Sequence, residues 1–175
     1  MKPIVLLGDS ITAGFPVRRL LKGYPVENRG VPADNTDLVL ARLEKDVIAL
    51  QPGAVFILIG TNDMAMGFTN DQTFSNYEAI LGRIIGGVPG VNVFVQSILP
   101  TRGLENRPLD RIAALNEGIR SIAYAHGADY LDIGPLFADE HGELSERYSK
   151  DGLHLLTAGY ELWAEYLHTL FDGLE

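Results

Sequence analysis

The chain has 175 residues, 46% of them hydrophobic, which is enough to bury the core of one domain. It has no cysteine, which excludes disulfides, thiolate catalysis and zinc sites built from cysteine. The formal net charge of −9, with 14 scattered basic residues, argues against nucleic acids and anionic membrane surfaces as partners.

The N-terminal stretch "PIVLL" is too short for the core of a signal peptide, and no cleavage site of small residues follows it. No apolar run approaches the roughly 20 residues that cross a membrane. We therefore expect one domain over residues 1–175, located in the cytoplasm and without a membrane span. The oligomeric state stays open, and a homo-oligomer is compatible with the sequence.

Apolar runs rich in β-branched residues alternate with segments of helical spacing along the chain. In chain order, strands are predicted at residues 4–7, 24–28, 54–59, 91–99 and 130–133, the signal at 24–28 being weak. Helices are predicted at residues 36–50, 71–88, 109–126 and 156–171, and irregular loops at 100–108 and 138–151. This alternation predicts an α/β fold with a parallel sheet covered on both faces.

Polar residues follow the predicted strands where each of them ends. Asp9 and Ser10 follow the first strand, Gly30 follows the weak one, and Asn62 and Asp63 follow the run at 54–59. Because ligands of open parallel sheets bind beyond the carboxyl ends of the strands, we expect these residues to share one edge.

Ser10 is either a helix cap or a nucleophile, and both roles suit a serine at the end of a strand. The second role needs a base and a carboxylate, and "DGLHL" supplies them as Asp151 and His154, three residues apart. In a helical turn, this spacing lets the Asp151 carboxylate reach one ring nitrogen of His154 while the other faces Ser10. Asp9 is expected to hold the loop around Ser10 through backbone hydrogen bonds.

An ester hydrolase also needs donors for the oxyanion, and three candidates are at hand. They are the backbone N–H of Ser10, the backbone N–H of Gly30, and the side-chain amide of Asn62. Gly30 lacks a Cβ, which would let its backbone approach a substrate closely. Asn62 donates without adding a charge beside His154.

Four segments, "GDSITAG", "NRG", "GTND" and "DGLHL", resemble in this order the four sequence blocks of the SGNH hydrolases, also called GDSL-type lipases and acylhydrolases. The resemblance covers the chain from end to end and implies a three-layer α/β/α flavodoxin-like fold with a five-stranded parallel sheet. It implies a triad of Ser10, Asp151 and His154, with Gly30 and Asn62 as the other invariant residues. "SILP" and "LLTAGYELW" are similar to the branch of the platelet-activating-factor acetylhydrolase catalytic subunits.

Two positions depart from the family pattern. The family name GDSL stands for the residues Gly-Asp-Ser-Leu, and Ile11 takes the place of that leucine. Ala33 stands where many relatives carry a second glycine. The first exchange is conservative, whereas the second changes the loop beside Gly30. The G-x-S-x-G elbow of ordinary α/β-hydrolases is absent, because Thr12 is the second residue after Ser10.

The expected function is a serine esterase that needs no cofactor or metal and takes a small-molecule ester of a short acyl group, acetyl first, on a carbohydrate-like or small alcohol. Polar rim loops and the lack of a lid segment favour short chains; Met64, Met66 and Phe68 are candidates to line an acyl pocket. A lysophospholipase or thioesterase is the alternative.

Two other classes of function remain open. One is a non-catalytic flavodoxin-like module that binds a phosphate, and the other is a phosphoesterase with a metal. The metal ligands would be Asp9, Asn62, Asp63, Asp151 and His154.

Overall fold

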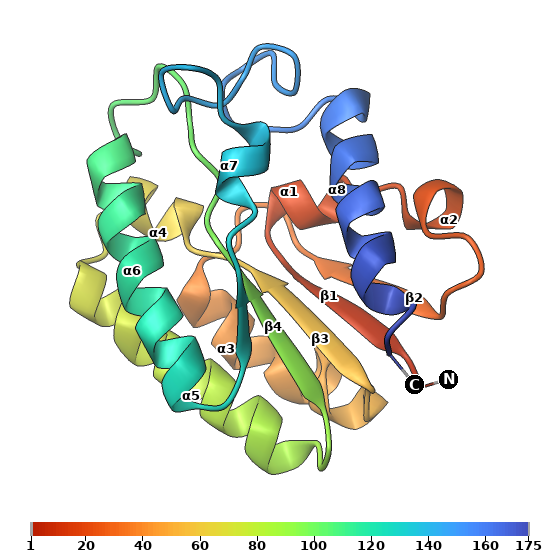
Figure 1. Cartoon of the computed structure of the whole chain (residues 1–175). Coiled ribbons are helices and arrows are strands. Elements are labelled where there is room, and N and C mark those ends of the chain that lie inside the picture. The colour runs from red at the N-terminus through yellow and green to blue at the C-terminus, as the bar shows by residue number, and fades with distance from the viewer. Residues whose placement is uncertain (1, 175) are drawn as a thin grey trace.

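The computed structural model describes residues 2–174, and its centre is a sheet of five parallel strands (Figure 1). The strands lie in the order β2-β1-β3-β4-β5. Their bounds are β1 Ile4–Gly8, β2 Val26–Gly30, β3 Ala54–Leu58, β4 Asn92–Gln96 and β5 Asp129–Leu131. The predicted five-stranded parallel sheet is confirmed, including the strand with the weak signal.

Helices cover both faces of this sheet. Four of them match the predicted helical segments: α3 Thr36–Asp46, α5 Asn70–Gly87, α6 Leu109–Ala125 and α8 Thr157–Phe171. Four more have only four or five residues, too few to show a helical period in the sequence: α1 Ser10–Ala13, α2 Val17–Leu20, α4 Thr61–Ala65 and α7 Gly134–Phe137. The short helices were therefore missed.

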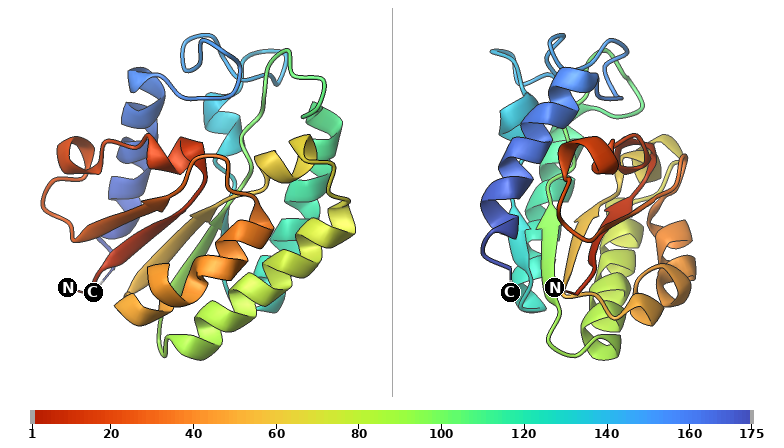
Figure 2. Two further views of the ribbon diagram at one scale, coloured as in Figure 1. Left: turned by 180° about the vertical axis from the view of Figure 1, so that it is seen from behind. Right: turned by 90° about the vertical axis from the view of Figure 1, so that its right-hand side faces the viewer.

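The alternation of side chains along each strand divides the core into two layers. Val5 and Leu7 of β1 belong to the cluster that α3, α5 and α6 cover. Ile4 and Leu6 belong to the cluster on the other face, together with Trp163 of α8. Figure 2 shows the sheet between α8 on one side and α3 and α5 on the other. The three-layer α/β/α architecture is confirmed.

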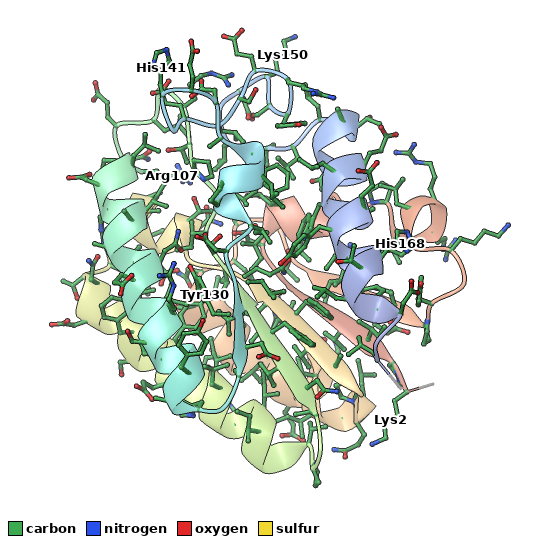
Figure 3. All side chains as sticks on the ribbon, in the orientation of Figure 1. Lys2, Arg107, Tyr130, His141, Lys150 and His168 are labelled. Carbon is green, nitrogen blue, oxygen red and sulfur yellow. The ribbon has the colours of Figure 1, made fainter. Side chains whose placement is uncertain are left out.

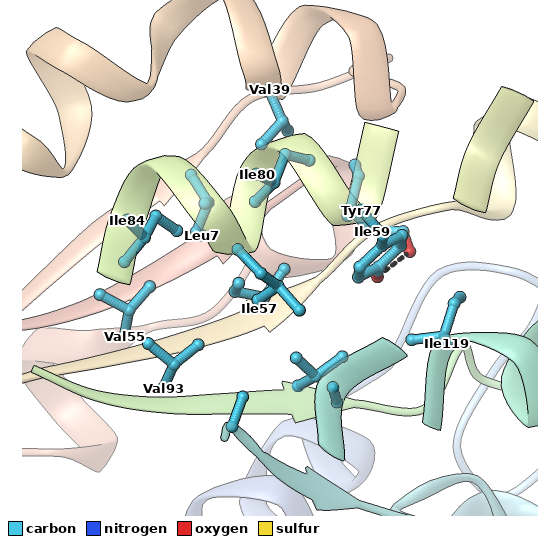
Figure 4. Packing of buried hydrophobic residues seen from close by; sticks show 14 of the residues in the cluster. Leu7, Val39, Val55, Ile57, Ile59, Tyr77, Ile80, Ile84, Val93 and Ile119 are labelled. Carbon is cyan, nitrogen blue, oxygen red and sulfur yellow. Dashed lines mark hydrogen bonds between the residues drawn. The ribbon is translucent and has the colours of Figure 1, made fainter. Parts of the chain in front are cut away.

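The face covered by α5 is packed with β-branched residues (Figure 4). Val55 and Ile57 of β3 lie beneath Ile80 and Ile84 of α5, and all four side chains are fully buried. Tyr77 places its ring in the same layer and donates its hydroxyl hydrogen to the Ile59 carbonyl at 2.8 Å. Because each such side chain contributes roughly 1.5–3 kcal/mol on burial, this layer holds the end of β3 rigidly in place.

The sheet changes its direction of winding between β1 and β3. The chain passes from β1 to its neighbour β2 on one side, and β3 then pairs with β1 on the other side. Ligands bind at such a reversal, beyond the carboxyl ends of the two strands. At this point Ser10 follows β1 after one intervening residue, Asp9, and Asn62 follows β3.

Two elements end at least three residues earlier than predicted. The strand predicted at 91–99 ends at Gln96, because the side-chain amide of Asn116 in α6 takes over both backbone groups of Ile98, at 2.8 and 3.0 Å. The helix predicted at 36–50 ends at Asp46. Val47 leaves the helical region at φ −131°, and a short 3₁₀ helix, η1 Ile48–Leu50, completes the segment.

Within residues 2–174, no helix combines the length and the apolar character needed to cross a lipid bilayer.

Candidate active site

The turn after β1 presents Ser10 at the start of α1. Gly8 allows this turn, because a Cβ there would lie 2.4 Å from the Leu58 carbonyl oxygen. Asp9 caps the helix, since its Oδ1 accepts the Ile11 N–H at 2.9 Å. Asp9 therefore holds the loop as expected, and the helix-cap role considered for Ser10 belongs to Asp9. The Ser10 hydroxyl is left free for another partner.

That partner is His154, and the structure brings the three residues of the expected triad together. The Ser10 Oγ lies 3.1 Å from His154 Nε2, and His154 Nδ1 lies 2.7 Å from Asp151 Oδ2. With a carboxylate at Nδ1, the proton of a neutral imidazole resides on Nδ1, and the lone pair of Nε2 points to the serine hydroxyl.

Asp151 and His154 meet in a bend rather than in the helical turn that their spacing suggested. Asp151 Oδ1 accepts the N–H groups of Leu153 at 2.9 Å and of His154 at 2.8 Å. Burial acts to raise the pKa of Asp151, but hydrogen bonds from the His154 ring and from these two N–H groups outweigh it and hold the pKa well below the usual range. The Asp151 carboxyl is therefore ionised at neutral pH.

Asn62 lies in the first turn of α4, at the end of β3, and its side chain is buried. Its Nδ2 donates to the Asp34 carbonyl oxygen at 2.8 Å, and its Oδ1 accepts from Arg107 Nη2 at 3.0 Å. Nδ2 carries two hydrogens, and the second has no partner within the described residues. One N–H of Asn62 is therefore available to a ligand, as is the orphan N–H of Ser10 in the first turn of α1.

Gly30 differs from its expected role as an oxyanion donor. It is the last residue of β2, and its N–H donates to the side-chain Oδ1 of Asn28 at 2.9 Å. A Cβ on Gly30 would lie 2.1 Å from the Ala13 backbone nitrogen. The absence of a side chain therefore serves the close packing of β2 against α1, and the N–H is not free to bind a substrate.

Ala33, the departure from the family pattern, has an unusual backbone. Its φ of 68° lies in the left-handed region that favours glycine. Strained conformations of this kind cluster at functional sites. Ala33 precedes Asp34, whose carbonyl oxygen holds Asn62, and within residues 2–174 the Ala33 N–H has no hydrogen-bond partner. The one sequence signal for this position was its mismatch with the glycine of relatives.

Three arginines that carry no sequence signal support the site. Arg42 of α3 donates to the Gly8 carbonyl oxygen at 3.1 Å and to Asp34 Oδ2 at 2.6 Å, so it joins the end of β1 to the loop beside Asn62. Arg102 donates through its backbone N–H to the Gly152 oxygen at 3.0 Å and steadies the segment with Asp151 and His154. The third is Arg107, which Figure 3 places nearer the sheet than His141 and Lys150 at the outer edge.

Within residues 2–174, the candidate ligands for a metal ion do not lie together as a metal site. Asp63 binds the start of α3 instead, because its Oδ1 accepts the Thr36 N–H at 2.9 Å and its Oδ2 accepts the Thr73 hydroxyl at 2.9 Å. Within residues 2–174, no group of three or more His, Cys, Asp or Glu side chains is arranged to hold a metal ion. The phosphoesterase hypothesis gains no support from the geometry.

Asp9 is 1% exposed, and its burial raises the pKa of the carboxyl to about 6, although the Ile11 N–H and the charges of His154 and Arg107 act in the opposite direction. The unfolded chain has a pKa of about 3.9 at this group. Because the folded protein binds the proton more tightly, Asp9 lowers stability as the pH rises from about 4 to about 6, and the full reduction is present above that range.

We therefore expect Asp9→Asn to raise the free energy of unfolding at pH 8 by about 1–3 kcal/mol, and to bring no such gain at pH 4, where Asp9 is protonated. Asparagine retains the oxygen that accepts the Ile11 N–H. Urea unfolding at pH 4, 6 and 8 measures the difference. Asp9→Ala is the control, because it removes the cap and is expected to lose about 1 kcal/mol at pH 4. A gain equal at pH 4 and pH 8 would contradict the prediction.

Comparison with known proteins adds a family model, described as GDSL-like lipase/acylhydrolase, that matches residues 6–162. A solved structure from Streptococcus pneumonia named for platelet activating factor is 28% identical with a TM-score of 0.91, covering 97% of this chain and 84% of that one. The lipase/acylhydrolase from Enterococcus faecalis is 27% identical with a TM-score of 0.85, covering 99% and 96%. Among curated proteins, the N-acylneuraminate cytidylyltransferase of Escherichia coli is 25% identical over 90% of this chain, which spans 37% of that protein's length.

Proposed function

Because the chain belongs to the GDSL-like lipase/acylhydrolase family, and is thereby a carboxylic ester hydrolase, we propose that it is a serine esterase that acts on short acyl groups through an acyl-enzyme. The observation that carries the mechanism is the line of contacts from Ser10 Oγ to His154 Nε2 and from His154 Nδ1 to Asp151, at 3.1 and 2.7 Å. This order of nucleophile, base and carboxylate is the one that acyl transfer requires.

In the first half-reaction, the Ser10 Oγ attacks the ester carbonyl carbon while His154 Nε2 takes the hydroxyl proton. Asp151 stabilises the imidazolium that forms. His154 then gives the proton to the leaving alcohol oxygen as the bond from the carbonyl carbon to that oxygen breaks. A water molecule repeats the sequence on the acyl-enzyme, which releases the carboxylic acid and restores Ser10.

The carbonyl oxygen becomes negatively charged in each half-reaction and needs N–H donors. We propose the Ser10 N–H, the free N–H of Asn62 Nδ2 and the Ala33 N–H for this role. Ala33 replaces Gly30 in the expected set, because the Gly30 N–H is already bonded to Asn28 at 2.9 Å.

The shape of the site supports a short acyl group. Beside Asp9 and Leu153 lies a small cavity of about 10 Å³, which has room for about one water molecule and none for an alkyl chain. Met64 is buried in the core rather than lining a pocket. The side chains of His154 and Asp151 are 49% and 56% exposed, so the site is open to a bulky polar alcohol. A carbohydrate-like ester, acetylated first of all, fits these features.

One feature favours the lysophospholipase or thioesterase alternative. A mostly apolar groove of about 290 Å³ runs between α6 and α7, and Ile98 and Pro100 belong to both this groove and the small cavity beside Asp9. Each methylene of a long chain buried there would contribute about 0.8 kcal/mol. The two functions therefore differ in how the rate depends on chain length.

We expect kcat/KM to be highest for p-nitrophenyl acetate and to fall toward the butyrate and octanoate esters, because the small cavity beside Asp9 has no room for a longer chain. Labelling of Ser10 by a fluorophosphonate, detected by mass spectrometry, tests the nucleophile in the same preparation. A non-catalytic module would show neither activity nor label.

Ala113→Phe distinguishes the alternative, since Ala113 lines the groove. Ala114→Phe on the same helix is the matched control, being exposed outside it. A steady rise of kcat/KM with chain length that Ala113→Phe abolishes and Ala114→Phe keeps would replace the short-chain esterase by a long-chain acylhydrolase.

A further inference from the structure

The loop between β4 and α6 brings a cationic side chain into contact with Asn62. Arg107 Nη2 donates to Asn62 Oδ1 at 3.0 Å. We propose that Arg107 is a positioning residue for ester hydrolysis: its guanidinium holds the Asn62 amide in the one orientation that directs an N–H of Nδ2 to the oxyanion. This inference rests on the serine esterase function proposed above.

The amide of Asn62 is held at both ends. The Asp34 carbonyl oxygen accepts from Nδ2 at 2.8 Å, while Oδ1 faces the guanidinium. A rotated amide would set N–H against N–H on one side and oxygen against oxygen on the other. Because Asn62 is 8% exposed, water has little access to replace the lost partner. Without the Arg107 guanidinium, the Asn62 Oδ1 loses the hydrogen bond at 3.0 Å, and the bond from Nδ2 to the Asp34 oxygen is left to hold the amide.

Arg107 is itself fixed by the loop that carries it. Its backbone N–H donates to the Leu104 oxygen at 3.0 Å, and its carbonyl accepts the Thr101 hydroxyl at 2.7 Å. Thr101 is 3% exposed, which anchors the loop to the core. The backbone that carries the guanidinium is therefore held in place, as accurate positioning of Asn62 requires.

The surroundings of Arg107 are not those of an arginine that serves stability. Within residues 2–174 the guanidinium forms no ion pair; its Nη1 donates to Asn106 Oδ1 at 3.2 Å, and its Nε is buried without a hydrogen-bond partner. Burial lowers the pKa of Arg107, although the Asp9 carboxylate acts to raise it. A buried group with an unmet hydrogen bond is unfavourable for folding, and such exceptions concentrate at functional sites.

Two other roles would leave different signatures. An arginine that only packs the loop would change stability, and an arginine that binds an anionic group of the substrate would change KM. A residue that acts through the Asn62 amide changes kcat, and only as long as that amide is present.

The test is a double-mutant cycle on p-nitrophenyl acetate, a neutral ester, with wild type, Arg107→Ala, Asn62→Ala and the double variant. We expect Arg107→Ala to lower kcat by about 10- to 100-fold with KM changed by less than about 3-fold, the loss typical of a displaced catalytic group. In the Asn62→Ala background, the same change should lower kcat by less than about 2-fold. Arg18→Gln is the control for charge, because Arg18 is exposed on α2 and should leave kcat unchanged.

Equal losses in both backgrounds, a change confined to KM, or an unchanged kcat would each overturn the positioning role. If a thermal melt shows that Arg107→Ala is unfolded, Arg107→Gln takes its place, since the glutamine amide keeps an N–H for Asn62 Oδ1. The kcat of Arg107→Gln should exceed that of a variant at position 107 that has no N–H donor. A wild type that neither hydrolyses esters nor labels at Ser10 overturns the esterase function as well, whereas a labelled, active wild type with an additive cycle overturns the positioning role alone.

Discussion

Replacing Ser10 with alanine is expected to abolish nearly all ester hydrolysis and to leave the fold intact. The loss in kcat should reach about 10⁴- to 10⁶-fold, because the variant lacks the hydroxyl that lies 3.1 Å from His154 Nε2 and its residual activity rests on binding and the oxyanion donors. The fold should persist because Asp9, and not Ser10, caps α1.

The measurement is kcat on p-nitrophenyl acetate together with the urea midpoint of each protein. Ser121→Ala is the matched control, since Ser121 lies on α6 and its hydroxyl donates only to the Glu117 carbonyl, at 3.1 Å. Both variants should keep the midpoint of the wild type within experimental error. Wild-type turnover in purified Ser10→Ala would show that the nucleophile lies elsewhere.

Asn62→Ala should lower kcat by about 10²- to 10³-fold with little change in KM, which is the usual loss for one oxyanion donor. The reason is that the N–H of Nδ2 contributes most when the carbonyl oxygen carries charge, and much less in the bound ester. The variant also leaves the Asp34 oxygen and Arg107 without their partner, and each unmet bond is expected to lower stability by about 1–3 kcal/mol. Assays therefore belong well below the melting temperature of the variant.

Asn92→Ala is the matched control for this change, because Asn92 is exposed at the opposite, amino end of β4. It should keep the kcat of the wild type. An effect of Asn62→Ala on KM alone would assign Asn62 to binding of the ground state rather than to the charged intermediate.

The sheet and its long helices follow from local patterns in the sequence. A run such as "AVFILI" is rich in β-branched residues, entirely apolar and too short to span a membrane. Such a run is most stable as a strand that is buried on both faces of a sheet. The strand predicted at 24–28 shows where local patterns stop being sufficient. This strand, β2, lies at the edge of the sheet and is only partly buried, and its observed position, Val26–Gly30, depends on pairing with β1. Register is a property of two strands and is absent from either one alone.

The residue types of the site also came from the sequence, since Ser10 and Asn62 stand after strands, Asp151 and His154 lie three residues apart near the C-terminus, and all four follow the order of the family's sequence blocks. Which hydrogen bond each group makes was decided by the tertiary structure. The Gly30 N–H is bonded to Asn28, the cap of α1 is Asp9, and the Asn62 amide is held by Arg107, 45 positions away. A polar group bonds to whichever partner packing brings within about 3 Å, and local sequence patterns do not record that distance.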